Sequence, residues 1–237
     1  MTNTISKKGV KSGTITKKGG QIIDISNPIM TISFNHYDDY TLVDPNSRVS
    51  RTATSQTITL VPNGEEAYSY YDAGVGYFSG DFTVQFKLNV PFTGADSQNG
   101  QFGIWGVSNN IGDFYTQRVA VAELIGLQVY AISSGRQDYQ LYLSTEWMSV
   151  DDTLTSLLCN TDYYITITRD DDGGGAGKGL MTVTVYTDSA RTAVFGTITQ
   201  QLNLQKDLRY VYSFSSWNVG SLKPCSGIIS NLEITTP

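Results

Sequence analysis

The chain has 237 residues, of which 40% are hydrophobic and 16% charged, and its formal net charge at pH 7 is −6. This length and composition allow one large β-domain with a substantial core and exclude wholesale disorder. The charge is uneven, because residues 1–20 hold five lysines and no acidic residue, so the other residues carry −11. A body this acidic repels nucleic acid and anionic membranes.

A basic arm, residues 1–21, precedes the predicted domain. Its segment TISKKG returns ten residues later as TITKKG, and its glycines disfavour a stable helix. We predict that the arm anchors the protein to an acidic partner or a neighbouring subunit. The lysines that would make this contact are Lys7, Lys8, Lys11, Lys17 and Lys18. No apolar export signal follows Met1, and no run of about 18 apolar residues is present, so we expect neither Sec-type export nor membrane insertion.

From Ile22 onward the pattern is that of short β-strands. Asn27-Pro28 breaks the first apolar run, and Pro62-Asn63-Gly64 ends the run TITLV. In TVQFKLNV (83–90) apolar and polar residues alternate, which predicts a half-buried antiparallel strand. The apolar side chains that should share its inner face are Val84, Phe86, Leu88 and Val90.

Further short runs follow at close intervals, among them FGIWGV, LQVYAI, YQLYL, YYITIT, LMTVTVYT, VFGTITQQL, LRYVYSF and GIISNLEI. About a dozen short strands separated by turn signals are typical of an antiparallel two-sheet β-sandwich or jelly roll. Only RVAVAELIG (118–126) has a pattern compatible with a helix. No linker follows residue 62, so we predict one all-β domain at 22–237.

The segment RDDDGGGAGKG (169–179) is the densest run of acid, glycine and lysine in the chain. A phosphate-binding loop does not fit, because the spacing from Gly173 to Gly177 is one residue short and Gly179 follows Lys178. An EF-hand loop does not fit either, because the three aspartates are consecutive. We therefore predict a hairpin connector whose acidic residues keep the strand edge solvated.

Three stretches resemble the concanavalin A-like, laminin-G-like jelly-roll superfamily. They are YSYYDAGVGYFSGDFTVQFKLNV (68–90), the hairpin at 162–198, and the closing strand SGIISNLEI (226–234), which should return beside the first core strand. The likeness spans roughly residues 57–237. Its segments YTDSARTAVFGTI and DLRYVYSFSSWN are similar to those of bacteriophage and other viral or environmental structural and adhesive proteins. The resemblance implies the fold, which is shared by lectins, adhesins, hydrolases, lyases and structural domains.

Catalytic residues are not indicated by the sequence. Glycan hydrolysis needs two carboxylates about 5–10 Å apart, but the E-x-D-x-x-E run of the superfamily's endoglucanases is missing. A lyase would use a histidine paired with tyrosine or arginine, and the one histidine, His36, lies outside the resemblance. His36 also has no second histidine or nearby cysteine with which to bind zinc. We therefore predict a protein that is not an enzyme, with a carbohydrate-active enzyme as the less favoured alternative.

Aromatic side chains are the remaining functional signal. Trp105 and Tyr70 lie in strand-like patterns and should pack within the fold. Trp147 in STEWMSVDD and Trp217 in SSWNVGS adjoin polar turns, and with Tyr139 they are the predicted glycan-binding residues.

Calcium is the one candidate cofactor, because several members of the superfamily carry an ion at the rim of the sandwich. The candidate ligands lie beside turns and are Asp72, Asp81, Asp113 and Asp188. Asp72 and Asp81 flank AGVGYFSG and would supply carboxylate ligands. We favour the interpretation that these aspartates form Asx turns at strand ends, which predicts weak calcium dependence at most. Cys159 and Cys225 are expected to be free thiols. The alternative is a disulfide between them, which requires that their strands are neighbours.

Together these patterns predict a structural or adhesive β-sandwich module on a virion surface or tail. Its partners would be virion or assembly subunits contacted through the arm, within a homo-oligomer or a larger assembly. The alternative is a lectin-like, receptor-binding module that binds a cell-surface glycan. The viral placement is implied by the resemblance and by the arm.

Overall fold

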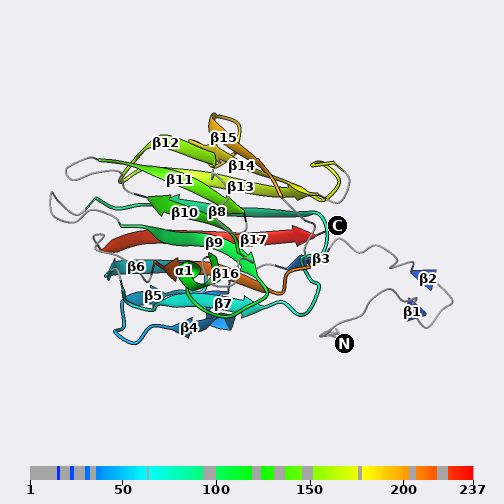
Figure 1. The fold of residues 1–237 in the computed structure, drawn as a ribbon, viewed down its shortest axis with the longest axis horizontal. Coiled ribbons are helices and arrows are strands. Elements are labelled where there is room, and N and C mark those ends of the chain that lie inside the picture. Colours follow the sequence, from blue (N-terminus) through cyan, green and yellow to red (C-terminus); the bar gives the residue numbers. More distant parts are fainter. Residues whose placement is uncertain are drawn as a thin grey trace.

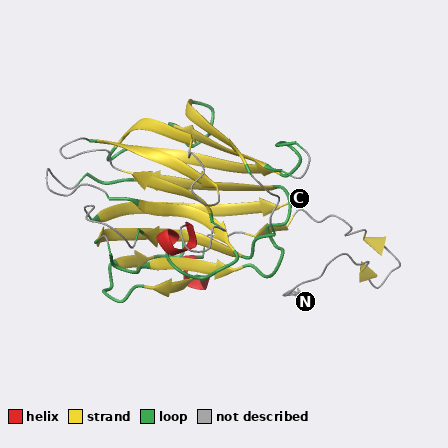
Figure 2. Ribbon diagram, viewed as in Figure 1, coloured by secondary structure: helices red, strands yellow, loops and turns green. Residues whose placement is uncertain are grey.

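The computed structural model describes residues 15–16, 22–23, 30–32, 36–62, 64–92, 100–118, 124–130, 137–145, 152–175, 178–202, 207–217 and 224–236. Strands make up most of these residues, and the helical elements among them are a 3-10 turn, η1 (Tyr37–Asp39), and one short helix, α1 (Phe114–Thr116) (Figure 2). Within the described ranges no helix has the length and apolar character needed to cross a membrane.

The strands form two antiparallel sheets, seen one in front of the other in Figure 1. Sheet I consists, in spatial order, of β12 (Asp152–Leu158), β11 (Asp138–Thr145), β10 (Ile125–Tyr130), β9 (Phe102–Ser108), β16 (Tyr210–Ser216), β7 (Tyr68–Asp72) and β4 (Thr41–Val43). Sheet II consists of β15 (Val194–Gln201), β14 (Leu180–Tyr186), β13 (Asp162–Asp170), β8 (Phe82–Asn89), β17 (Cys225–Thr236), β6 (Ser55–Val61) and β5 (Val49–Arg51). In addition, β3 (Met30–Ile32) pairs with β17, and β1 (Ile15–Thr16) pairs with β2 (Ile22–Ile23). The predicted two-sheet antiparallel β-sandwich is confirmed.

The core lies between the two sheets, and β8 shows how the sequence builds it. The side chains of Val84, Phe86 and Leu88 are fully buried, whereas the polar residues between them are partly exposed. This is the alternation predicted from TVQFKLNV. Strand β8 pairs with both β13 and β17, so the closing strand returns beside the first core strand, as expected.

The acid-rich segment after β13 is a hairpin connector, because β13 and β14 pair antiparallel on either side of it. Its acidic residues do more than solvate an edge. Arg169 is buried, donates from Nη1 to the Phe78 carbonyl at 2.9 Å, and donates from Nε to Oδ1 of Asp171 at 2.9 Å. The Asp171 amide in turn donates to Oδ1 of Asp81 at 2.8 Å. The connector therefore supplies the counter-ion that a buried guanidinium requires.

Two further sequence-based expectations can be compared with the structure. Cys159 is a free thiol, as expected, and burial raises its pKa to about 11. The segment RVAVAELIG (118–126) is described at its two ends, and its last two residues, Ile125 and Gly126, belong to β10. The end of that segment is therefore strand.

Candidate functional site

The aromatic residues predicted to bind a glycan have different positions in the structure. Trp147 and the five arm lysines lie outside the described residues. Tyr139 is fully buried, and its ring meets that of Tyr163 edge-on at 6.4 Å within the core. The prediction that Tyr139 contacts a sugar is therefore wrong, because on β11 this position faces inward. Trp217 follows β16 and is partly exposed, at the outer face of sheet I.

The candidate calcium ligands Asp72 and Asp81 are both engaged by protein groups. Asp72 forms a bidentate ion pair with Arg209, at 2.8 Å from Nε to Oδ1 and 2.6 Å from Nη2 to Oδ2. Its Oδ1 also accepts the Gly74 amide at 3.0 Å, which is the geometry of an Asx turn. Across the described ranges, no three His, Cys, Asp or Glu side chains come together as a metal site.

Asp113 and Asp188, the other aspartates beside turns, have local partners as well. Asp113 caps α1 by accepting the Thr116 amide at 3.0 Å. Asp188 accepts the amides of Thr192 and Ala193 at 2.9 and 2.7 Å. These bonds favour the turn-forming role of the aspartates, and calcium binding stays an untested prediction.

The outer face of sheet I carries a row of side chains that begins on β10 and β11. Tyr130 and Gln140 lie opposite each other across these two strands. On the other side of β10, Val129 pairs with Phe102 of β9. In an antiparallel ladder the pairing advances one residue on each strand in opposite directions, so Tyr130 also lies beside Gln101.

The same register extends the row to Trp217. Ser216, the last residue of β16, pairs with Phe102, so the next residue, Trp217, lies beside Gln101 as well. All four side chains are partly exposed. Across four neighbouring strands the order is aromatic, amide, aromatic, amide. We call these residues the aromatic–amide row: Trp217, Gln101, Tyr130 and Gln140.

Buried polar groups hold the first amide of the row in place. Gln101 donates from Nε2 to Oε1 of Gln128 at 2.6 Å, and Gln128 donates from Nε2 to Oγ of Ser144 at 3.0 Å. Gln128 and Ser144 are fully buried. An unsatisfied buried amide is costly, so the series of hydrogen bonds from Gln101 through Gln128 to Ser144 fixes the orientation of Gln101.

The second amide and its neighbouring ring are oriented by Tyr142, which lies on β11 two residues beyond Gln140. The Tyr142 hydroxyl donates to Oε1 of Gln140 at 2.9 Å. Its ring meets the Tyr130 ring edge-on, with centroids 5.6 Å apart and an interplanar angle of 87°. Tyr142 therefore restrains both the polar and the aromatic member at this end of the row.

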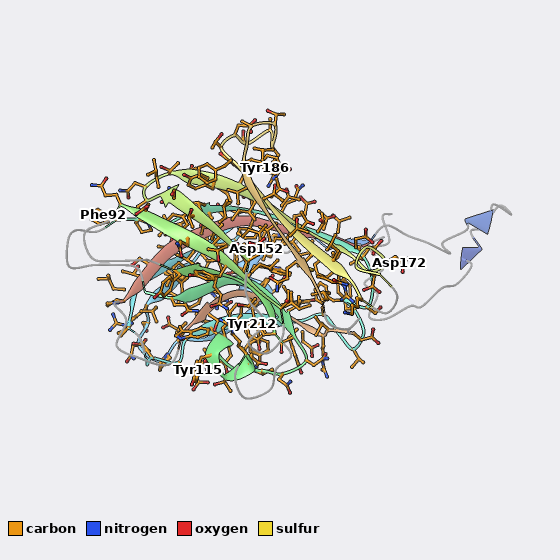
Figure 3. The ribbon with its side chains drawn as sticks, turned by 45° about the horizontal axis from the view of Figure 1, so that its top comes forward. Phe92, Tyr115, Asp152, Asp172, Tyr186 and Tyr212 are labelled. Carbon is orange, nitrogen blue, oxygen red and sulfur yellow. The ribbon has the colours of Figure 1, made fainter. Side chains whose placement is uncertain are left out.

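At the other end of the row, Trp217 packs against the segment around α1. Its ring lies edge-on to Tyr115, with centroids 5.4 Å apart, and the guanidinium carbon of Arg118 lies 5.8 Å from the indole centroid. Figure 3 shows Tyr115 on this segment. The indole is thus held in place from one side while part of it stays exposed.

The segment around α1 is seated on sheet I by Phe114. The ring lies over Gly103, Gly106 and Gly126, and a Cβ built on Gly103 would stand 2.2 Å from its Cε2 atom. The Phe114 amide donates to Oγ of Ser215 at 2.8 Å. Only glycine leaves room for the ring, so the outer face beyond the row is occupied by the protein itself.

The sequence did not single out Gln101, Tyr130 or Gln140. A signal was present, because Gln128 and Tyr130 in LQVYAI, and Gln140 and Tyr142 in YQLYL, recur with a period of two. That period indicates a shared strand face. It does not tell which strands are neighbours, so the row itself was not visible.

Comparison with known proteins establishes the fold. No protein-family model matches the chain, and no curated protein matches its sequence. A lectin from Bauhinia forficata in complex with GalNAc aligns with a TM-score of 0.56 and 11% identity over 87% of this chain and 98% of that chain. Lectin I-B4 from Griffonia simplicifolia aligns at 0.55 and 8% over 88% and 100%. The alginate lyase Aly36B aligns at 0.53 and 12% over 88% and 96%.

The chain therefore has the concanavalin A-like jelly-roll fold that the sequence resemblance implied. At these identities the likeness extends to the fold alone, and lectins and a lyase share it.

Proposed function

We propose that the protein is a non-enzymatic glycan-binding module and that the aromatic–amide row is its binding face. The observation that carries the proposal is the alternation of Trp217, Gln101, Tyr130 and Gln140 across four neighbouring strands. A sugar offers apolar C–H faces, which pack on aromatic rings, and hydroxyls, which exchange hydrogen bonds with amides. The row supplies both kinds of partner at strand spacing.

The restraint of the row supports binding. Gln101 is held through Gln128 and Ser144, and Gln140 and Tyr130 are held by Tyr142. Side chains that are already ordered lose little conformational entropy when a ligand arrives. Tyr130 and Gln140 also lie within strands, and binding groups built on strands are positioned more accurately than those on loops.

The chemistry of this face supports a role without catalysis. The row contains no carboxylate, imidazole or amine. Two tyrosines on the same face, Tyr68 and Tyr212, have pKa values raised by burial. These two tyrosines are therefore unsuited to act as a base, because a tyrosine base must lose its proton near neutral pH.

The virion-surface role stays a prediction. It depends on the basic arm, whose lysines lie outside the described residues. An adhesive virion protein needs both an anchor and a ligand face, so this placement is compatible with the row. Removal of residues 1–20 should abolish incorporation into an assembly and leave glycan binding intact. Unchanged assembly would contradict the anchoring role.

A glycan array with the full-length chain tests the proposal. We expect retention of at least one glycan, and about tenfold weaker retention for Trp217→Ala. Thr168→Ala, which changes the outer face of sheet II, is the matched control and should bind like the wild type. A folded wild-type protein that binds nothing on the array would overturn the proposal.

The enzyme alternative is tested with the same protein preparation. Neutral and uronate polysaccharides are incubated with the chain, and new reducing ends and unsaturated ends are measured. We expect neither to accumulate. Products that disappear in Tyr142→Phe would identify an enzyme and replace the non-enzymatic part of the proposal.

A further inference from the structure

We infer that the aromatic–amide row selects an uncharged, linear oligosaccharide that lies across the strands of sheet I. The inference rests on the proposed function and adds the class of ligand and its direction. It is drawn from the length of the row, from the protein groups that border it, and from the charges at its two ends.

The length of the row favours an oligosaccharide over a single sugar. Tyr130 and Gln140 lie on β10 and β11, and Gln101 and Trp217 directly adjoin the ends of β9 and β16, so the row crosses four consecutive strand positions of sheet I. Neighbouring strands lie about 4.8 Å apart, so the row is roughly 14 Å long. One pyranose ring covers about one strand spacing. Contact with Trp217 at one end and Gln140 at the other therefore requires several linked sugars.

The direction of the ligand follows from what occupies the rest of the face. The outward position after Gln101 on β9 is Gly103, and the Phe114 ring covers it. Phe114 is fully buried and held by its amide, so this space is filled. A glycan that extended along β9 would collide with the ring. Across the strands, by contrast, the four side chains of the row are partly exposed.

The charges at the row favour a neutral ligand. Gln101, Tyr130 and Gln140 are uncharged, so the interior of the row offers hydrogen-bond donors but no cation to pair with a carboxylate. Arg118 lies at the Trp217 end. Asp138 is two residues from Gln140 on β11 and so points to the same face. One cation and one anion at opposite ends offset each other over the row as a whole.

The net charge of the rest of the protein also favours a neutral ligand. A polyuronate such as alginate carries a carboxylate on every sugar. The residues after the arm carry a net −11 in a chain whose total is −6. A negative body slows the approach of a polyanion and weakens its binding, most of all at low salt. A neutral glycan is unaffected by this repulsion.

Isothermal titration calorimetry with the full chain tests the inference. The probes are manno- and xylo-oligosaccharides from mono- to hexasaccharide, and oligomannuronates of the same lengths. We expect affinity for at least one neutral series to rise up to about the length of the row and then to level off. Uronates should bind at least about tenfold more weakly, and the affinity of the neutral series should not change with salt.

Two variants show which part of the row each sugar uses. Gln140→Ala should lower the affinity for the longer neutral oligomers and leave that for the shortest binding oligomer unchanged. Trp217→Ala should lower both. Thr184→Ala, on the outer face of sheet II, is the control, and circular dichroism checks that each variant is folded.

The outcomes separate the two proposals. Equal affinity for a monosaccharide and a hexasaccharide, or a preference for uronates, would overturn the inference and leave glycan binding standing. If neither these probes nor any glycan on the array binds the folded chain, glycan binding itself fails.

Discussion

The outer faces of the two sheets differ although the same kind of strand builds both. Sheet II presents threonines in register: one row is Thr83, Thr168, Thr182 and Thr199, and the next is Thr166, Thr184 and Thr197. Sheet I presents glycines, amides and aromatic rings, and part of its face is covered by the segment around α1. The β-sandwich fold thus does not determine which residue types occupy the outer faces of its sheets.

The difference shows which outer residues call for an explanation beyond the fold. Threonine is favoured on a half-exposed pleated surface, so the rows of sheet II are what strand formation alone would select. Glycine weakens a strand, and a buried amide must be paired to be tolerated. Three glycines and Gln128 on sheet I therefore reflect a further requirement. The glycines accommodate Phe114, and Gln128 orients the aromatic–amide row.

The largest effect that would sharpen this comparison is expected at Gly103. Gly103→Val places side-chain atoms where the Phe114 ring lies, and we expect the free energy of unfolding to fall by about 3 kcal/mol. Urea denaturation measures the change. Thr184→Val, at an outward position of sheet II, should stay within about 0.5 kcal/mol of the wild type. The double variant Gly103→Val/Phe114→Ala should be less unstable than the sum of the two single changes predicts. Wild-type stability in Gly103→Val would show that the ring is not held against the sheet.

A second test compares a tyrosine from each face. Tyr130→Ala removes a ring of the row and should lower glycan affinity about tenfold. Tyr164→Ala removes a partly exposed ring from sheet II, where it lies under Arg191 with the guanidinium carbon 6.0 Å from its centroid. This variant should bind like the wild type. Equal losses in calorimetry would mean that the ligand face is not confined to sheet I.

A smaller effect is expected at Asp188, in the turn between β14 and β15 of sheet II. Hydrogen bonds from the Ala193 amide and from Thr192 lower the pKa of Asp188 below its ordinary 3.8. A lowered folded-state pKa means that the stabilisation is present above pH 3.8 and is lost as the pH falls through the lowered value. Asp188→Asn should therefore melt slightly lower than the wild type at neutral pH, and the two melting temperatures should converge in acid. A difference that persists at the lowest pH would contradict this origin.

The smallest effect is expected from a metal chelator. Asp72 at the end of β7 is paired with Arg209, and Asp81 before β8 accepts the Asp171 amide. Their carboxylates already have partners, so EDTA should shift the melting temperature by less than about 2 °C, whereas a bound ion at saturating concentration would add several kcal/mol. A large fall in melting temperature that added calcium reverses would establish the ion site that the superfamily resemblance implies.

The sequence predicted those parts of the fold that are determined by residues close together in the chain. The alternation in TVQFKLNV, the hairpin around the acidic connector, and the burial of Trp105 are each encoded within a few neighbouring residues. The closing strand was placed beside β8 through the superfamily resemblance, which supplied the long-range pairing that the residues alone do not reveal. The counter-ion role of Asp171 was missed, because it depends on the burial of Arg169.

The candidate site was predicted only at Trp217. Tyr139 was chosen one position away from Gln140, and in a strand one position decides between the core and the outer face. Gln101 and Trp217 come from distant parts of the chain and meet only because β9 and β16 are neighbours. Such a pairing depends on topology, which a single sequence does not specify.

The position of β17 has a consequence for the order of events during synthesis. Strand β8 emerges from the ribosome early, yet its neighbour β17 begins at Cys225, and β6 pairs with the same late strand. The middle of sheet II, where β17 lies between β6 and β8, thus cannot form while most of the polypeptide is being made. Pairings so distant in sequence are slow to form, and the unpaired edges of β6 and β8 are open to other nascent chains in the meantime. Efficient production should therefore depend on a chaperone that shields these edges until the last strand arrives.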